Sequence, residues 1–278
     1  MKAFGLTLRI AGATLVLVAL QVVWTHPRSL AQGALSVLPN LLVVLALALV
    51  AASTRHQGWK LAGTLFVLYF GINQLNTLDE ALLFNVGVNA SQAIRMMGSG
   101  FLASLIFAPL LVLILGCWEK KPQEEAKPLV PHSAASRVGR ILLADLLYVL
   151  CYFVAGMIVF PFVKDFYAGI NLPAPASILE MQVFRGLVYV AAGLAVADGM
   201  KGDRGRTAVA LGLSFPILAG VAPLLLPNPY LPDHVRLAHG LEIGISNLVY
   251  GVLLGYLITR KAAPATGGGR IESAESLS

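Results

Sequence analysis

The stretch from Asn228 to Tyr256, NPYLPDHVRLAHGLEIGISNLVYGVLLGY, decides how this chain folds. It begins with a proline-rich loop and continues as an apolar segment that is long enough for a helix to enter a bilayer. At about 100° per residue, its polar side chains fall within roughly 140° of the helix circumference. This polar stripe consists of Arg236, His239, Glu242, Ser246, Asn247 and Tyr250.

Four glycines form a second stripe on the same segment, beside the polar one: Gly240, Gly244, Gly251 and Gly255. Small residues let two membrane helices approach closely, and ionisable groups in membrane helices mostly face the interior of a bundle. We therefore expect this helix to pack closely through its glycines and to hold its polar side chains inside the protein.

The composition of the whole chain indicates an integral membrane protein. Of its 278 residues 57% are hydrophobic and only 12% are charged, whereas a soluble domain has about a quarter charged residues. Apolar runs of about 20 residues, the length that crosses a bilayer, recur along the chain. The fold class that we predict is an all-α bundle of membrane helices, with the lipid bilayer as its main partner.

The net charge of +6 does not indicate nucleic-acid binding, because the basic residues lie in short loops between the apolar runs. Eight membrane-spanning helices are predicted, at about residues 5–24, 34–53, 59–78, 96–117, 139–162, 178–198, 206–226 and 238–259. The first run has the charge pattern of a signal peptide, but its length favours a retained helix.

The distribution of Lys and Arg predicts the orientation of the chain. With the N-terminus inside, 15 of the 20 Lys and Arg residues fall in loops on the inner side. Positively charged loops stay in the cytoplasm, so both termini are predicted to be cytoplasmic. Together with the absence of a long extracellular domain, this pattern favours a bacterial inner membrane.

A polar, proline-containing linker at residues 118–138 divides the predicted spans into two groups of four. We expect a first membrane half at residues 1–117, a second half at 139–261 and a flexible cytoplasmic tail at 262–278. The sequence leaves the oligomeric state open.

On this topology, polar side chains gather at the outer ends of several spans. We expect an ion-paired cavity that is open to the outside, with this core: Glu80, Arg95, Arg185, His239 and Glu242. Beside the core we place Gln182, Arg236 and Asn247. Polar residues inside a membrane are costly, so such a cluster indicates function. Arginine–carboxylate pairs at helix ends can also serve helix packing alone.

The predicted role of the cavity is to bind or transport a small polar solute or ion. His239 and Glu242 would exchange protons or coordinate the solute, and Arg185 and Arg95 would hold an anionic group or pair with Glu80. Polar residues are few in the inner halves of the spans (Gln21, Asp145 and Ser214), which counts against a complete transport path.

Other functions remain open at this point. His239 and Glu242 could belong to a metal site, but the second histidine of an HExxH motif is absent, so we assign no metal ligand and no catalytic residue. No cofactor is indicated. A non-catalytic role in envelope assembly is a further alternative that the composition does not exclude.

The segment Glu180–Gly186, EMQVFRG, resembles part of the glutamate–arginine motif of the CAAX-type prenyl-protease and bacteriocin-immunity membrane family. That family has a paired Glu where this chain has Met181, and a His one span later, where this chain has only Phe215-Pro-Ile-Leu-Ala219. The catalytic set would be incomplete, so close membership is not expected. The resemblance implies an alternative function, an intramembrane enzyme acting on lipid or prenyl-type substrates.

A longer pattern in the second half resembles a family of bacterial polytopic membrane proteins of unknown activity. It consists of Asn228-Pro-Tyr-Leu-Pro232, Val235-Arg236, His239, Glu242, Ser246-Asn247 and Tyr250-Gly251, with Gln182, Arg185 and Gly186. The resemblance supports the choice of candidate residues and implies no activity.

Overall fold

The computed structural model describes residues 3–25, 30–83, 89–119, 134–168, 172–201, 204–226 and 231–259. The regular elements in these ranges are helices: α1 (Ala3–Thr25), α2 (Leu30–Leu35), α3 (Val37–Ser53), α4 (Gly58–Leu68), the π-helix η1 (Tyr69–Leu75), α5 (Asn76–Leu83), α6 (Ala90–Leu115), α7 (Ala134–Tyr167), α8 (Pro175–Gly199), α9 (Arg204–Pro216), the π-helix η2 (Ile217–Val221), α10 (Ala222–Leu224) and α11 (Asp233–Ile258). The predicted all-α membrane bundle is thereby confirmed.

Seven helical segments within the described residues are long and apolar enough to cross a membrane, one fewer than the eight spans predicted. The exception is the predicted span 59–78. It is helical, but it is built from α4, η1 and α5, and its second half contains Asn73, Gln74 and Asn76. These amides make the segment less apolar than its neighbours. The chain is a multi-pass helical membrane protein; the side on which its termini lie stays a prediction.

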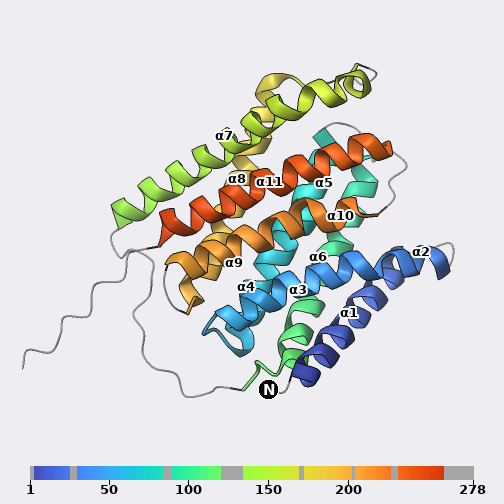
Figure 1. Ribbon diagram of the computed structural model, residues 1–278, viewed down its shortest axis with the longest axis vertical. Helices are drawn as coiled ribbons and strands as arrows, with labels where there is room; N and C mark the ends of the chain where they lie inside the picture. Colours follow the sequence, from blue (N-terminus) through green and yellow to red (C-terminus); the bar gives the residue numbers. More distant parts are fainter. Residues whose placement is uncertain are drawn as a thin grey trace, which may run out of the picture.

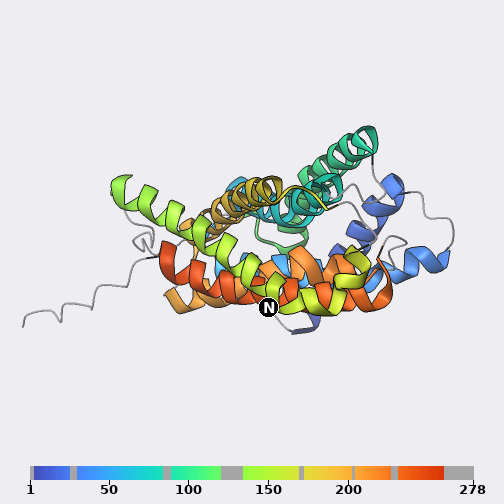
Figure 2. The same ribbon diagram turned by 90° about the horizontal axis from the view of Figure 1, so that it is seen from above.

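The helices form two layers around a shared core. Figure 1 shows α11 between α7 and α9, with α3 next to α9. Viewed from above (Figure 2), α11, α9 and α3 form one layer, and α8 and the helices from α4 to α6 form a second layer against it. Buried side chains from α1 through α11 belong to one hydrophobic core. Both predicted halves thus contribute to it, and their division into separate units stays a prediction.

The glycine stripe of α11 was predicted to allow close packing, and it does so in its second half, where it lies against α9. A methyl group on Gly255 would lie 2.5 Å from the Cα of Ala208, and one on Gly251 would lie 2.7 Å from the carbonyl oxygen of Leu211. Gly244 is less tightly packed, because the nearest atom to such a methyl group is 3.7 Å away. Only the glycines at 251 and 255 are therefore required for close approach.

The two π-helical turns contact each other across the predicted halves. The Asn73 side chain in η1 donates a hydrogen bond of 2.8 Å to the carbonyl of Leu218 in η2. Turns of this kind leave backbone carbonyls out of the regular helical pattern and are common at functional sites. The amide of Asn73 thus compensates for an irregularity in a helix of the other half.

Helix α7 extends about five residues beyond the predicted span at each end, from Ala134 to Tyr167. Tyr167 is therefore the last residue of a helix instead of part of a loop. The predicted tail at 262–278 and most of the predicted linker lie outside the described residues.

Candidate functional site

Hydrogen bonds join three side chains from two helices at one end of the bundle. The hydroxyl of Tyr167 lies 2.8 Å from Nε2 of His239, and Nδ1 of His239 lies 2.9 Å from a carboxylate oxygen of Glu242. The side chains of His239 and Glu242 are only 16% and 12% exposed. We call this the Tyr167–His239–Glu242 chain, and the end of the bundle that contains it the His239 end.

The chemistry of the three groups determines the direction of the hydrogen bonds. A carboxylate only accepts, so Nδ1–H of His239 donates to Glu242. In the neutral imidazole, Nε2 then accepts from the hydroxyl of Tyr167, and in the imidazolium it donates to the same oxygen. The histidine is therefore oriented at both nitrogens, and it can take up or release a proton without losing either partner.

Local geometry explains why these residues meet. His239 and Glu242 are three residues apart on α11 and share a face of the helix. The other oxygen of Glu242 faces Gly156 on α7, where a methyl group would lie 3.5 Å from it. The carboxylate end of the Tyr167–His239–Glu242 chain therefore faces a glycine of α7.

The predicted Arg185 forms a separate buried ion pair that links α8 to α5. Its Nε and Nη2 each lie 3.0 Å from Oδ1 of Asp79, and its Nη2 also donates to the carbonyl of Asn76. The side chain of Arg185 is 7% exposed and that of Asp79 is 15% exposed. A buried guanidinium requires this pairing, because an unpaired charge there would be strongly destabilising. The side chain of Glu80, the predicted partner, lies outside the described residues.

The backbone next to Arg185 and the side chain of Glu242 contact α7 at different levels. Gly186, next to Arg185, lies against Asp145 and Tyr148 of α7, whereas Glu242 lies against Gly156 of the same helix. Tyr148 and Gly156 are eight residues apart, which is about 12 Å along a helix. Gly186 and Glu242 therefore contact α7 about two helical turns apart.

The remaining predicted residues differ in their surroundings. Gln182 is completely buried, and neither polar atom of its amide has a hydrogen-bond partner among the described residues. Asn247 is buried and donates to the carbonyl of Ile243. Arg236 binds the carbonyl of Leu226 and the carboxylate of Asp233, so it fixes the start of α11. Arg95 is exposed on α6.

Tyr167 and Asp79 are the site residues that the predicted set lacks. Tyr167 lies beyond the end of the predicted span, and only the extension of α7 brings it over α11. Asp79 is adjacent in sequence to the predicted Glu80, so the sequence pointed to the correct turn of helix and to the neighbouring carboxylate.

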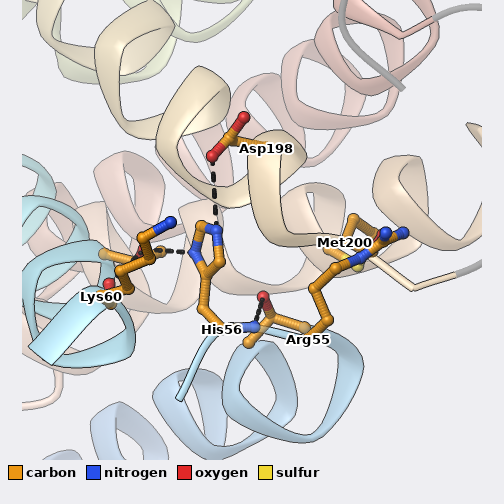
Figure 3. A network of polar contacts seen from close by, with 7 residues as sticks. Arg55, His56, Lys60, Asp198 and Met200 are labelled. Carbon is orange, nitrogen blue, oxygen red and sulfur yellow. Dashed lines mark hydrogen bonds and ion pairs between the residues drawn. The ribbon is translucent and has the colours of Figure 1, made fainter. Parts of the chain in front are cut away.

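A second polar cluster joins the two predicted halves (Figure 3), at the end of the bundle away from the start of α11 (Figure 1). Thr54 pairs with Met200 as an isolated antiparallel bridge, and Arg55 donates from its backbone to Gly199 and from its side chain to the carbonyl of Met200. Nε2 of His56 lies 3.3 Å from a carboxylate oxygen of Asp198. We call this the His56 clamp; the sequence analysis did not predict it.

Burial lowers the pKa of His56, because a charged imidazole is poorly solvated in the clamp. The nearby carboxylate of Asp198 acts in the opposite direction and raises the pKa, while Lys60 lowers it further. Nδ1 of the ring lies 3.2 Å from the hydroxyl of Thr64. The net result is a histidine that favours its neutral form in the folded protein.

No cluster of three His, Cys, Asp or Glu side chains that could hold a metal ion occurs among the described residues. No family model matches this chain, and neither a curated protein nor a solved structure matches it. The resemblance to a family of bacterial membrane proteins thus stays a prediction. The sequence and the fold define the class of protein: it is a multi-pass helical membrane protein, and three hydrogen-bonded polar side chains lie at one end of its bundle.

Proposed function

We propose that this membrane protein binds a small polar solute or ion at the Tyr167–His239–Glu242 chain and exchanges a proton with it. The observation that carries the proposal is the histidine that is hydrogen-bonded at both nitrogens, to a phenol and to a carboxylate. Such an imidazole can move a proton between its partners near neutral pH. Placing a histidine and a carboxylate in a membrane helix costs free energy, and a function explains that cost better than helix packing does.

The charges around the site favour a cation, or a solute with hydrogen-bond donors, over an anion. Glu242 and the hydroxyl of Tyr167 offer acceptor oxygens. Of the arginines in the predicted set, Arg185 and Arg236 are each bound to a carboxylate, and Arg95 is exposed on α6. Of the two roles predicted from the sequence, coordination by His239 and Glu242 is therefore better supported than anion binding by arginines.

We further propose that the protein lies in a bacterial inner membrane with its termini in the cytoplasm. The distribution of Lys and Arg supports this orientation. On it, the His239 end faces the outside and the His56 clamp faces the cytoplasm, so the site would take its solute from outside the cell.

One observation supports a second candidate function, a membrane hydrolase acting on lipid or prenyl-type substrates. A hydroxyl, an imidazole and a carboxylate follow one another in the order nucleophile, base and orienting group that covalent catalysis uses. The hydroxyl of Tyr167 would be indispensable to such an enzyme. A binding site would keep the carboxylate and imidazole as its main ligands.

The test is ligand-dependent thermal unfolding of the full-length protein in detergent. Wild type is compared with His239→Ala, Glu242→Gln and Tyr167→Phe, and His234→Ala is the control, because His234 is exposed on the first turn of the same helix. Sodium, ammonium, amino acids, divalent metals and small anions are added in turn. A ligand at 100 times its dissociation constant stabilises the protein by about 2.7 kcal/mol, so a shift of several degrees is expected.

The proposal predicts that a cation or donor-bearing solute raises the unfolding temperature of wild type and His234→Ala. The shift should be lost in His239→Ala and Glu242→Gln and reduced in Tyr167→Phe. If no added ligand shifts the unfolding temperature of wild type, and the variants only unfold at lower temperature, the Tyr167–His239–Glu242 chain serves helix packing. The proposed function is then wrong. Hydrolysis of a lipid ester that Tyr167→Phe abolishes would favour the enzyme.

A further inference from the structure

A second buried polar group lies deeper in the bundle, where α7, α8 and α11 meet. Asp145 of α7 is 9% exposed, and its Oδ1 has no hydrogen-bond partner among the described residues. The hydroxyl of Tyr250 on α11 is likewise buried and without a hydrogen-bond partner there. Tyr148 connects the two groups, because it packs with Asp145 on Gly186 of α8 and its ring lies 5.2 Å from that of Tyr250. Buried polar atoms without a hydrogen-bond partner are rare in folded proteins, so this pair of groups needs an explanation.

The surroundings of the Asp145 carboxyl are apolar and aromatic. Its Oδ1 packs directly on Gly186 of α8, where any side chain would overlap with it. The ring of Tyr148, which also packs on Gly186, lies 4.7 Å from that of Tyr189 and 5.2 Å from that of Tyr250, so tyrosines from all three helices pack together next to this position.

No cation balances this carboxyl in the described part of the chain. The nearby titratable groups are Tyr148, which packs with Asp145 on Gly186, and Tyr189 of α8 and Tyr250 of α11, which pack against the ring of Tyr148; Cys151 lies further along α7. Arg185 precedes Gly186 on α8, but its guanidinium is bound to Asp79 of α5. A bare carboxylate in such a place costs several kcal/mol, so the group must be neutralised by a proton or by a bound cation.

The composition of the site favours the proton. A hard cation needs a shell of several oxygen ligands, commonly with more than one carboxylate, and a single carboxyl is present here. A protonated carboxyl needs only one acceptor, and the hydroxyl of Tyr250 on the facing helix is a buried group that still lacks a hydrogen-bond partner in the described part of the chain. We propose that Asp145 is a proton-binding residue of this protein, with Tyr250 as its hydrogen-bonding partner.

The position of Asp145 connects it to the outer site. Gly156 of α7 lies against Glu242 of α11, and Tyr148 lies against Tyr250, eight residues further along each of the two antiparallel helices. Asp145 is therefore about 16 Å from the level of Glu242 along α7. Asn247, whose buried Oδ1 lacks a hydrogen-bond partner among the described residues, lies between the two levels on α11.

Asp145 is one of the few polar residues that the sequence analysis found in the inner halves of the spans, and the structure aligns it with the outer site along α7. If the proposed function holds, the same helix pair carries a proton-exchanging histidine near one end and a proton-binding carboxyl deeper in. The coupled ion of that function would then be a proton. This last step rests on the proposed function, whereas proton binding by Asp145 does not.

The test is infrared spectroscopy of the full-length protein in detergent at neutral pH, in water and in deuterated water. A protonated carboxyl group has its own carbonyl band, separate from those of carboxylates, and the band shifts on deuteration. The band is expected in wild type and in Asp165→Asn, a matched control at an exposed position of α7. It should be absent in Asp145→Asn.

Tyr250→Phe keeps the carboxyl and removes its partner, so the band should persist at a changed frequency. This variant decides the question even if Asp145→Asn does not fold, because a band unmoved by Tyr250→Phe overturns the proposal. A band that Asp145→Asn leaves in place overturns it too, as does one that sodium removes at constant pH. Ligand-dependent unfolding without the band would refute this inference alone, and the band without any ligand response would refute only the proposed function.

Discussion

His56 shows how one residue makes the stability of the clamp depend on pH. Burial lowers its pKa in the folded protein from an ordinary value of 6.5. Below that value the unfolded chain takes up a proton that the folded chain resists, so unfolding binds protons and is favoured as the pH falls. The stability that neutral His56 contributes is therefore present above pH 6.5 and is lost as the pH falls through the folded pKa.

We predict that the unfolding temperature of wild type decreases between pH 7 and pH 5, and that His56→Gln decreases less over the same range. Asp198→Asn should show a steeper decrease than wild type, because the carboxylate that raises the pKa of His56 is gone. His234→Ala, at an exposed position, is the control for histidine removal and should follow wild type. Parallel curves for wild type and both clamp variants would contradict this account.

Some residues of the candidate site could be predicted from the sequence, and others could not. The pairing of His239 with Glu242 could be predicted from their spacing alone, because residues that are three positions apart lie on the same face of a helix. Tyr167 could not be added, since its contact depends on where α7 ends and how it packs on α11. Asp145 was visible as a lone acid in an apolar run, but its alignment with Tyr250 is a property of three packed helices.

Among the elements, α11 combines two faces with different requirements. Its polar face meets α7, and the glycines at 251 and 255 bring it against the backbone of α9. The periodicity of the sequence predicted both faces, because the helical repeat alone assigns residues to them. It could not predict which of the four glycines are needed, since that depends on the shape of α9.

We predict that a glycine-to-alanine substitution destabilises the protein at one position of this stripe and has little effect at another. In Gly255→Ala the new methyl group would lie 2.5 Å from the Cα of Ala208, which is backbone and cannot move aside. The expected cost is about 1–3 kcal/mol. In Gly244→Ala the nearest atom is 3.7 Å away, so little change is expected. Thermal unfolding of both variants in the same detergent checks the pair, and equal losses would show that the α9–α11 contact is wrong.

At the scale of the whole molecule, the helical membrane fold was predictable from the apolar runs, and the number of spans less so. Side-chain amides make the segment from η1 to α5 less apolar. Composition alone does not distinguish a segment of this kind that crosses the bilayer from one that lines a polar interior. The contacts that join the two predicted halves, such as Asn73 with Leu218, involve residues far apart in sequence and carried no local signal.

The orientation of the molecule can be measured by labelling introduced cysteines. In a background where Cys117 and Cys151 are replaced by Ser, Asp165→Cys marks the His239 end and Lys201→Cys marks the end with the His56 clamp; both positions are exposed. We predict that a membrane-impermeant maleimide labels Asp165→Cys on intact cells and Lys201→Cys only after permeabilisation. The reverse pattern would invert the topology and place the proposed solute site on the cytoplasmic side.

The clamp also has a consequence for biosynthesis. The side chain of Arg55 binds the carbonyl of a residue that lies 145 positions later in the chain. At about 5–20 residues per second, a ribosome needs roughly 7 to 30 s to synthesise that stretch. During this time the polar loop after α3 is already made while its acceptors do not yet exist. The nascent protein must therefore keep its first helices inserted while one face of the bundle is still open to lipid, chaperone or protease.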